Sequence, residues 1–125
     1  MDDTLIEALA RMPSSEVVRR AGYTDFLARH EHALLFFTGD TGQHREGIDV
    51  AIVVRELMKK YGDRLALGIV DRRDEAALMA KAGVVVLPAI AFVARGRTVD
   101  VVARMRDWTA YEQAVGRLFE AGAGQ

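Results

Sequence analysis

The stretch that decides the fold is "AKAGVVVLPAIAFVARGR", residues Ala80–Arg97. Its apolar run Ala89–Ala94 is typical of a buried strand, and "RGR" at 95–97 predicts a tight turn. Thr98–Val102 then predicts a second strand, paired antiparallel to the first. Gly83 suits the end of the helix that precedes the proline. This part of the chain therefore reads as helix, proline, strand, turn and strand.

Apolar spacing gives the remaining elements. Strands alternating with helices predict parallel pairing through right-handed crossovers. The fold class is therefore α/β, with a central mixed sheet flanked by helices and an extra N-terminal helix. We expect a single domain over 1–125, in which 1–13 form a helical extension and 121–125 a frayed end. The sequence predicts further strands at Glu16–Arg19, Ala33–Phe37 and Leu65–Val70. It predicts helices at Leu5–Met12, at Asp25–His30 with Thr24 as cap, at Asp49–Tyr61, from Asp71–Asp74 to Lys81, and after a cap at Asp107 or Thr109.

Composition excludes several classes of protein. The chain has no cysteine, which rules out disulfides, thiolate metal sites and thiol catalysis. A net charge of −1 with scattered basic residues does not favour nucleic acid or an acidic membrane as partner. Since no segment approaches the roughly 20 apolar residues of a membrane helix, we expect no membrane insertion. Acids within Met1–Glu7 argue against a signal peptide, and we expect a cytoplasmic protein.

The segment "LLFFTGDTGQHREG", Leu34–Gly47, leaves a predicted strand as a polar loop, in the way that active-site loops begin. It offers no cysteine, no serine and no glycine-rich phosphate cradle. His30, His32 and His44 follow no metal-ligand spacing, so we expect surface histidines, no metal and no cofactor. The loop therefore shows no evident catalytic chemistry.

The proline segment resembles the thioredoxin family. Gly83 and Val84 match the glycine–apolar pair that ends a thioredoxin helix, and Leu87–Pro88 matches the apolar–proline step at the family's spacing. This resemblance implies a thioredoxin-like fold in which Pro88 is the cis proline beside the active-site loop. The family's Cys-x-x-Cys would fall near Gly42–Arg45, where no cysteine stands. The resemblance therefore implies the fold without its redox chemistry.

One group of thioredoxin-like proteins is similar over nearly the full length. The segments "LLFFTGD", "DVAIVVREL", "LPAIAFVARG" and "ARMRDWTAY" resemble the HyaE/HupG/HoxO-type hydrogenase expression/formation proteins, which lack the dithiol. The resemblance implies a non-catalytic accessory chaperone of [NiFe]-hydrogenase maturation. Its expected partner is the twin-arginine signal peptide of the hydrogenase small-subunit precursor, bound before export.

A peptide groove without cysteines needs backbone groups for strand-like pairing and carboxylates for the arginines. Asp49 has an alternative role as a helix cap, and Asp40 as a turn residue. For Asp71, at the end of a predicted strand, capping of the next helix is the favoured reading. The candidate peptide-binding residues are Asp40, Glu46, Asp49, Leu87, Pro88 and Ala89.

A second function stays open beside the peptide-binding one. A redox-inactive thioredoxin-like scaffold would dock to another folded protein through an apolar patch, for example around Trp108. The spacing of Trp108 and Tyr111 favours the core for both, and Arg104 is expected to pair with Asp107. The sequence also leaves a homo-oligomer open.

Overall fold

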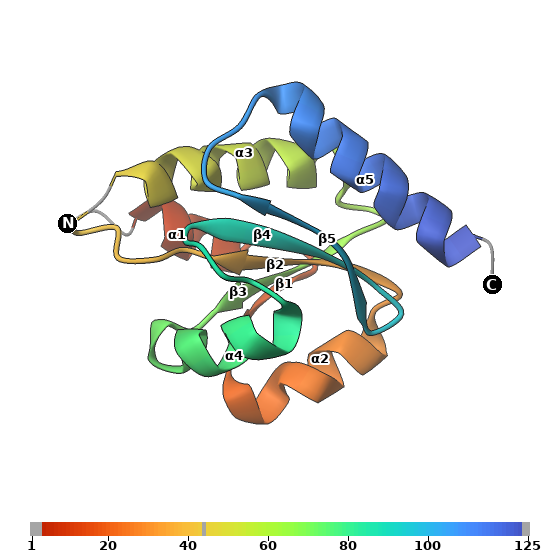
Figure 1. Cartoon of the computed structure of the whole chain (residues 1–125), viewed down its shortest axis with the longest axis horizontal. Coiled ribbons are helices and arrows are strands. Elements are labelled where there is room, and N and C mark those ends of the chain that lie inside the picture. The colour runs from red at the N-terminus through yellow and green to blue at the C-terminus, as the bar shows by residue number, and fades with distance from the viewer. Residues whose placement is uncertain (1–3, 44, 124–125) are drawn as a thin grey trace.

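The structure, a computed structural model, describes residues 4–43 and 45–123 (Figure 1). It contains a five-stranded sheet in the order β1-β3-β2-β4-β5. The strands are β1 Ser15–Val18, β2 His32–Phe37, β3 Ala66–Val70, β4 Ala89–Ala94 and β5 Arg97–Ala103. The helices are α1 Thr4–Ala10, α2 Tyr23–Arg29, α3 Glu46–Tyr61, α4 Glu75–Ala82 and α5 Trp108–Ala123, with short 3-10 helices η1 Arg20–Gly22 and η2 Arg72–Asp74.

The sheet is mixed, as predicted. Strand β3 runs parallel to both β1 and β2, whereas β4 runs antiparallel to β2 and to β5. In the β2–β4 ladder, Phe37 lies opposite Ala89. The carboxyl end of β2 is therefore next to the amino end of β4, which brings the polar loop after Phe37 beside Pro88. This pairing creates the candidate site, at the left of Figure 1.

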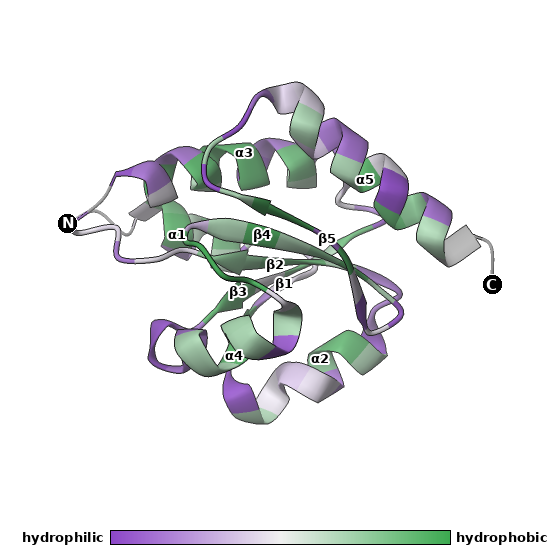
Figure 2. Cartoon of the chain, in the orientation of Figure 1, coloured by the Kyte–Doolittle hydropathy of each residue, from purple (hydrophilic) through white to green (hydrophobic). Residues whose placement is uncertain are grey.

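Two apolar layers hold the sheet between helices. Helices α1, α3 and α5 cover one face, and α2 and α4 cover the other (Figure 1). Strand β2 contributes side chains to both layers. Leu34 and Phe36 lie in the layer with α1, α3 and α5, and Leu35 and Phe37 lie in the layer with α2 and α4. All four side chains are fully buried, and each stabilises the fold by roughly 1.5–3 kcal/mol. Figure 2 shows the strands as mainly hydrophobic and the hydrophilic residues along the outer parts of the helices.

The helix starts differ from the predicted ones by a few residues. Helix α3 begins at Glu46, three residues before Asp49. It needs no side-chain cap, because the carbonyl of Arg45 accepts hydrogen bonds from the N–H groups of Ile48 and Asp49. Helix α2 begins at Tyr23 without a cap from Thr24, because η1 leads directly into it.

The two ends of the chain are helical within the described residues. Helix α1 ends at Ala10 and a turn follows before β1. Helix α5 continues to Ala123, past position 121 where the sequence predicted fraying, while 124–125 and 1–3 lie outside the described residues. None of the helices described here is long and apolar enough to cross a membrane.

Candidate functional site

The peptide bond between Leu87 and Pro88 is cis, as the resemblance implied. Pro88 is buried directly before β4, and its carbonyl accepts the N–H of Arg104 at 2.7 Å. Leu87 is partly exposed, and the described part of the chain supplies no hydrogen-bond partner for its main chain. The backbone of Leu87 is thus open to strand-like pairing with a ligand.

Ala89 does not belong to the surface of the site. Its side chain is fully buried, and its position in β4 lies between Phe37 and Ala103 of the neighbouring strands. The side chain of Ala89 therefore does not face the hollow, and a contact through its main chain stays a prediction.

The loop after β2 is pressed against both α3 and Leu87. A Cβ atom on Gly47 would lie 2.5 Å from the carbonyl oxygen of Thr38, so only glycine allows this approach. Gly39 has a φ of 71°, and its Cβ position lies 3.4 Å from the Cβ of Leu87. The two glycines give the loop its close packing, and the loop becomes one wall of a hollow.

The hollow has a volume of about 170 Å³. It is lined by four of the six predicted residues, from three separate segments of the chain: Asp40, Glu46, Leu87 and Pro88. Asp49 does not line it. On the other side of the loop lies a second hollow of about 410 Å³, which includes Glu7 of α1 and Arg72. The first hollow is lined by Thr38, Gly39, Asp40, Glu46, Gly47, Leu87, Pro88 and Arg104.

Glu46 is the most strongly engaged acid of the site. Its Oε1 accepts hydrogen bonds from Nε of Arg104 at 2.7 Å and lies 2.6 Å from Nη2 of the same guanidinium. Its Oε2 accepts the N–H of Met105 at 2.8 Å. The hydrogen bonds from Arg104, followed by the one from Met105, hold the pKa of Glu46 below its ordinary value. Arg104 therefore pairs with Glu46 and not, as predicted, with Asp107.

Asp40 and Asp49 are both exposed. Oδ1 of Asp40 accepts the N–H of Gly42 at 3.0 Å, so this residue does close a turn, while it also lines both hollows. Asp49 lies in the first turn of α3, where a carboxylate interacts favourably with the helix dipole. Asp40 therefore fills its alternative role as a turn residue and also reaches the hollow, whereas Asp49 is not the cap of α3 and does not line the hollow.

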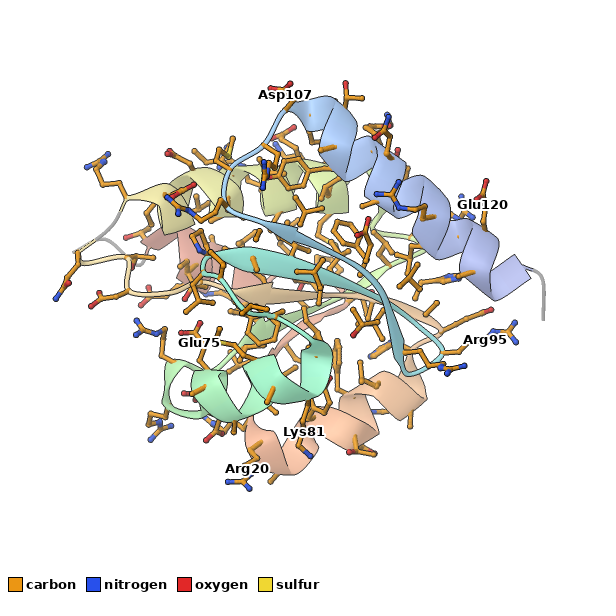
Figure 3. The ribbon with its side chains drawn as sticks, in the orientation of Figure 1. Arg20, Glu75, Lys81, Arg95, Asp107 and Glu120 are labelled. Atoms are coloured by element: carbon orange, nitrogen blue, oxygen red, sulfur yellow. The ribbon has the colours of Figure 1, made fainter. Side chains whose placement is uncertain are left out.

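A buried acid that the sequence did not point to anchors the loop. Glu75, in the first turn of α4, is 5% exposed and accepts the N–H of Gly39 at 3.0 Å. Its other oxygen lies 3.1 Å from Nε of Arg72, whose Nη1 donates to the carbonyl of Gly39 at 3.0 Å. Figure 3 labels Glu75 at the start of α4, below the sheet. The two peptide groups that flank Gly39 are thus each held by a charged side chain.

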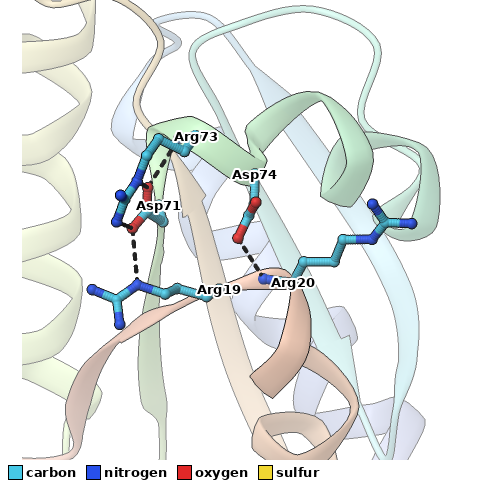
Figure 4. A network of polar contacts seen from close by, with 5 residues as sticks. All are labelled: Arg19, Arg20, Asp71, Arg73 and Asp74. Atoms are coloured by element: carbon cyan, nitrogen blue, oxygen red, sulfur yellow. Dashed lines mark hydrogen bonds and ion pairs between the residues drawn. The ribbon is translucent and has the colours of Figure 1, made fainter.

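Asp71 has a structural role, as the favoured reading stated. It caps η2 by accepting the N–H of Arg73 at 2.9 Å, and it also contacts the guanidinium groups of Arg73 and Arg19 (Figure 4). The hydrogen bonds from Arg73, then the one from Arg19, hold the pKa of Asp71 far below its ordinary value. In the same network, Asp74 accepts the N–H of Arg20 at 2.8 Å. These contacts join η1 to η2 and leave no open reactive acid at Asp71.

Large apolar side chains are exposed around the site. Val85 is 84% exposed and Val86 is 45% exposed, directly before Leu87. Tyr111 is fully buried, as predicted, but Trp108 is 41% exposed, so its assignment to the core is wrong. Trp108 shares a helix face with Glu112, one turn later, whose carboxylate contacts Lys60 and Tyr61 of α3.

Within residues 4–43 and 45–123, no group of three or more His, Asp or Glu side chains could hold a metal ion. His32 is partly buried, and its ring packs edge-on against Phe119 with the ring centroids 5.1 Å apart, which corrects its prediction as a surface residue. His30 is also partly buried, while His44 lies outside the described residues.

Comparison with known proteins places the chain in a family. The family described as hydrogenase-1 expression protein HyaE matches residues 5–111. The hydrogenase expression/formation protein HupG of Bradyrhizobium diazoefficiens is 38% identical over 93 residues, which cover 74% of this chain and 63% of that protein. The chain thus spans less than two thirds of that relative's length.

Solved structures agree on the fold. A crystal structure of the hydrogenase expression/formation protein HupG from Rhodopseudomonas palustris has a TM-score of 0.59 and 34% identity, and the match covers 87% of this chain and 98% of that one. Thioredoxin from Plasmodium falciparum has a TM-score of 0.67 at 16% identity, covering 80% and 96% of the two chains, and supports the thioredoxin-like fold alone. The fold and the matched segments together show that this chain belongs to the HyaE family of hydrogenase expression/formation proteins.

Proposed function

We propose that the protein is a non-catalytic accessory chaperone of [NiFe]-hydrogenase maturation. It binds the twin-arginine signal peptide of the small-subunit precursor in the cytoplasm, before export. Family membership supports a role in hydrogenase expression and formation. The absence of cysteine from the chain supports a binding role over thiol chemistry.

The observation that carries the peptide-binding proposal is the surroundings of Leu87. Its main-chain groups, with which no described residue forms a hydrogen bond, lie next to a hollow lined by two acids, Asp40 and Glu46. The exposed side chains of Val85 and Val86 directly precede Leu87 in the chain. An extended peptide pairing with Leu87 would thus have acids for its arginines and apolar surface for the segment that follows them.

Titration calorimetry with a synthetic leader peptide tests this function. We expect a Kd of about 1 μM or tighter, weakened when both arginines are replaced by lysine, because ammonium groups cannot form bidentate pairs with carboxylates. We also expect weaker binding as the salt concentration rises from about 0.05 to 0.5 M, since exposed charge pairs are screened. If neither peptide binds, the proposed function is wrong.

Two matched variants locate the binding. Asp40→Asn removes an exposed acid that lines the hollow, and we expect it to weaken the arginine peptide. Asp63→Asn removes an exposed acid just beyond the opposite end of α3. Since a 16-residue helix is about 24 Å long, this control should bind like the wild type.

A second function is favoured by one observation. Trp108 and Met105, which are 41% and 44% exposed, offer aromatic and flexible apolar surface of the kind found in protein interfaces. A redox-inactive scaffold would use this surface to dock to a folded partner. Pull-down of the small-subunit precursor with and without its leader separates the two functions, because a scaffold retains the leaderless protein and a signal-peptide chaperone does not.

A further inference from the structure

The carboxylate best placed for a ligand arginine is already bound to an arginine of the chain itself. Both Nε and Nη2 of Arg104 approach the same oxygen of Glu46, at 2.7 and 2.6 Å. Both residues line the hollow beside Pro88. A ligand guanidinium that uses Glu46 must therefore either replace Arg104 or share the carboxylate with it.

The backbone of Arg104 is fixed independently of this ion pair. Its N–H donates to the carbonyl of Pro88 at 2.7 Å, and its carbonyl accepts the hydroxyl of Tyr111 at 3.2 Å. Its φ of 67° is in the left-handed region, which is unfavourable for a residue other than glycine. Such a conformation persists only where the surroundings enforce it, and it often marks a functional position.

The side chain of Arg104, in contrast, can leave without moving the backbone. It is 55% exposed, and the side chain of Glu46 is 25% exposed. An ion pair open to solvent is weak, because water and salt compete with it. Glu46 would keep the N–H of Met105 on its second oxygen while the first exchanged its partner.

We propose that Arg104 is an internal competitor at this site, which occupies Glu46 until a ligand guanidinium replaces it and so sets the affinity that a ligand needs. The inference rests on the proposed function and concerns the same hollow. Replacement of one guanidinium by another conserves charge and hydrogen-bond geometry, whereas a lysine ligand cannot restore both contacts to Oε1. Since both kinds of ligand must displace Arg104, the internal ion pair weakens the binding of each by the same factor. The preference for arginine over lysine therefore comes from Glu46, and Arg104 sets the threshold of affinity.

Calorimetry with Arg104→Gln tests this role, using the twin-arginine peptide and its twin-lysine form. We expect both peptides to bind more tightly, because Glu46 is no longer occupied. The gain should be about two- to fivefold for each peptide, the equivalent of one exposed ion pair. The ratio of the two affinities should therefore stay the same, because both peptides displace the same competitor.

Arg95→Gln is the matched control. Arg95 is also an ion-paired arginine in the left-handed region, with a φ of 52° and a contact of 2.9 Å to Glu31. It lies at the other end of β4 (Figure 3, right), about 20 Å from Pro88 at the rise of a strand. We expect this variant to bind both peptides like the wild type.

The outcomes separate this inference from the function on which it rests. If Arg104→Gln weakens the binding of the arginine peptide or leaves it unchanged, the proposed role of Arg104 is wrong and the proposed function still stands. If the arginine peptide binds neither the wild type nor any variant, the role of Arg104 and the proposed function are both wrong. If it binds Arg104→Gln alone, both are supported. In the Glu46→Gln background the substitution at Arg104 should have no effect on affinity, and a persisting effect would contradict the exchange at Glu46.

Discussion

Glu75 holds Gly39 across 36 residues of sequence, through a hydrogen bond of 3.0 Å between the buried carboxylate and the main-chain N–H. Substitution of Glu75 by alanine leaves this N–H without an acceptor. Because an unsatisfied buried donor costs about 1–3 kcal/mol, we expect Glu75→Ala to lower the free energy of unfolding by that amount. Urea denaturation measures the loss, and hydrogen exchange at Gly39 should become faster.

Glu75→Gln and Glu120→Ala are the controls for this prediction. The glutamine oxygen can still accept the N–H of Gly39, so its effect should be smaller than that of alanine. Glu120 is exposed on α5 (Figure 3), and its removal should change stability by less than about 0.5 kcal/mol. Equal stability of Glu75→Ala and Glu120→Ala would contradict the anchoring role.

Gly47→Ala should be destabilising, because the new Cβ would meet the carbonyl oxygen of Thr38 at 2.5 Å. We expect a loss of about 1–3 kcal/mol, as for other overpacked positions. Gly116→Ala, inside α5, has no atom within 4 Å of its Cβ position and should be stabilising by about 0.5–1 kcal/mol. The Tm values of the two variants should therefore shift in opposite directions from that of the wild type. Shifts in the same direction would contradict the steric argument.

Tyr111→Phe removes a hydroxyl that serves two main-chain groups. The hydroxyl accepts the N–H of Arg106 at 3.1 Å and donates to the carbonyl of Arg104. We expect a loss of about 1 kcal/mol in urea denaturation, the usual value for a buried hydrogen bond. Tyr61→Phe, whose hydroxyl contacts a partly exposed Glu112, should lose less, because water can replace the contact. The reverse order of the two losses would contradict this account.

The ion pair of Glu46 predicts a pH dependence of stability. The folded state lowers the pKa of Glu46, chiefly through Arg104, below an ordinary value of 4.5. The ionised carboxylate therefore stabilises the folded state above about pH 4.5, and this contribution is lost as the pH falls through the lowered pKa. We expect the wild type to have a higher Tm than Glu46→Gln at about pH 7, and the difference to vanish at strongly acid pH.

Glu120→Gln is the control for the pH series, because Glu120 is exposed on α5. Its Tm difference from the wild type should stay small and flat over the same pH range. A difference for Glu46→Gln that is as flat as the control would show that the Glu46–Arg104 pair adds no stability.

The fold could be predicted because its signals are local. The apolar run of β4 and the turn after it are visible within a few residues, and the context of Pro88 identifies the step before the strand. The position of the site followed from the same signals. Asp40 and Leu87 meet because β2 ends where β4 begins, a consequence of their antiparallel pairing.

The charged partners could not be predicted from local patterns. Glu46 and Arg104 are 58 residues apart in sequence, and a glutamate in a first helical turn looks the same whether it faces solvent or a guanidinium. One signal was available for Arg104. It directly follows β5, the strand that pairs with β4, and this pairing brings it next to Pro88. Trp108 was misassigned because spacing describes a helix face and does not show where that face extends beyond the sheet.

The anchoring of the loop also determines which hydrogen-bond donors the site can offer to a ligand. The main-chain donors of Gly39 and Gly42 are both taken by side-chain carboxylates. The first turn of α3 carries Glu46 and Asp49, so this helix start is no cradle for an anion. These two N–H groups are therefore not available to a ligand. A phosphate or carboxylate should find neither of them, nor the start of α3, free to bind it.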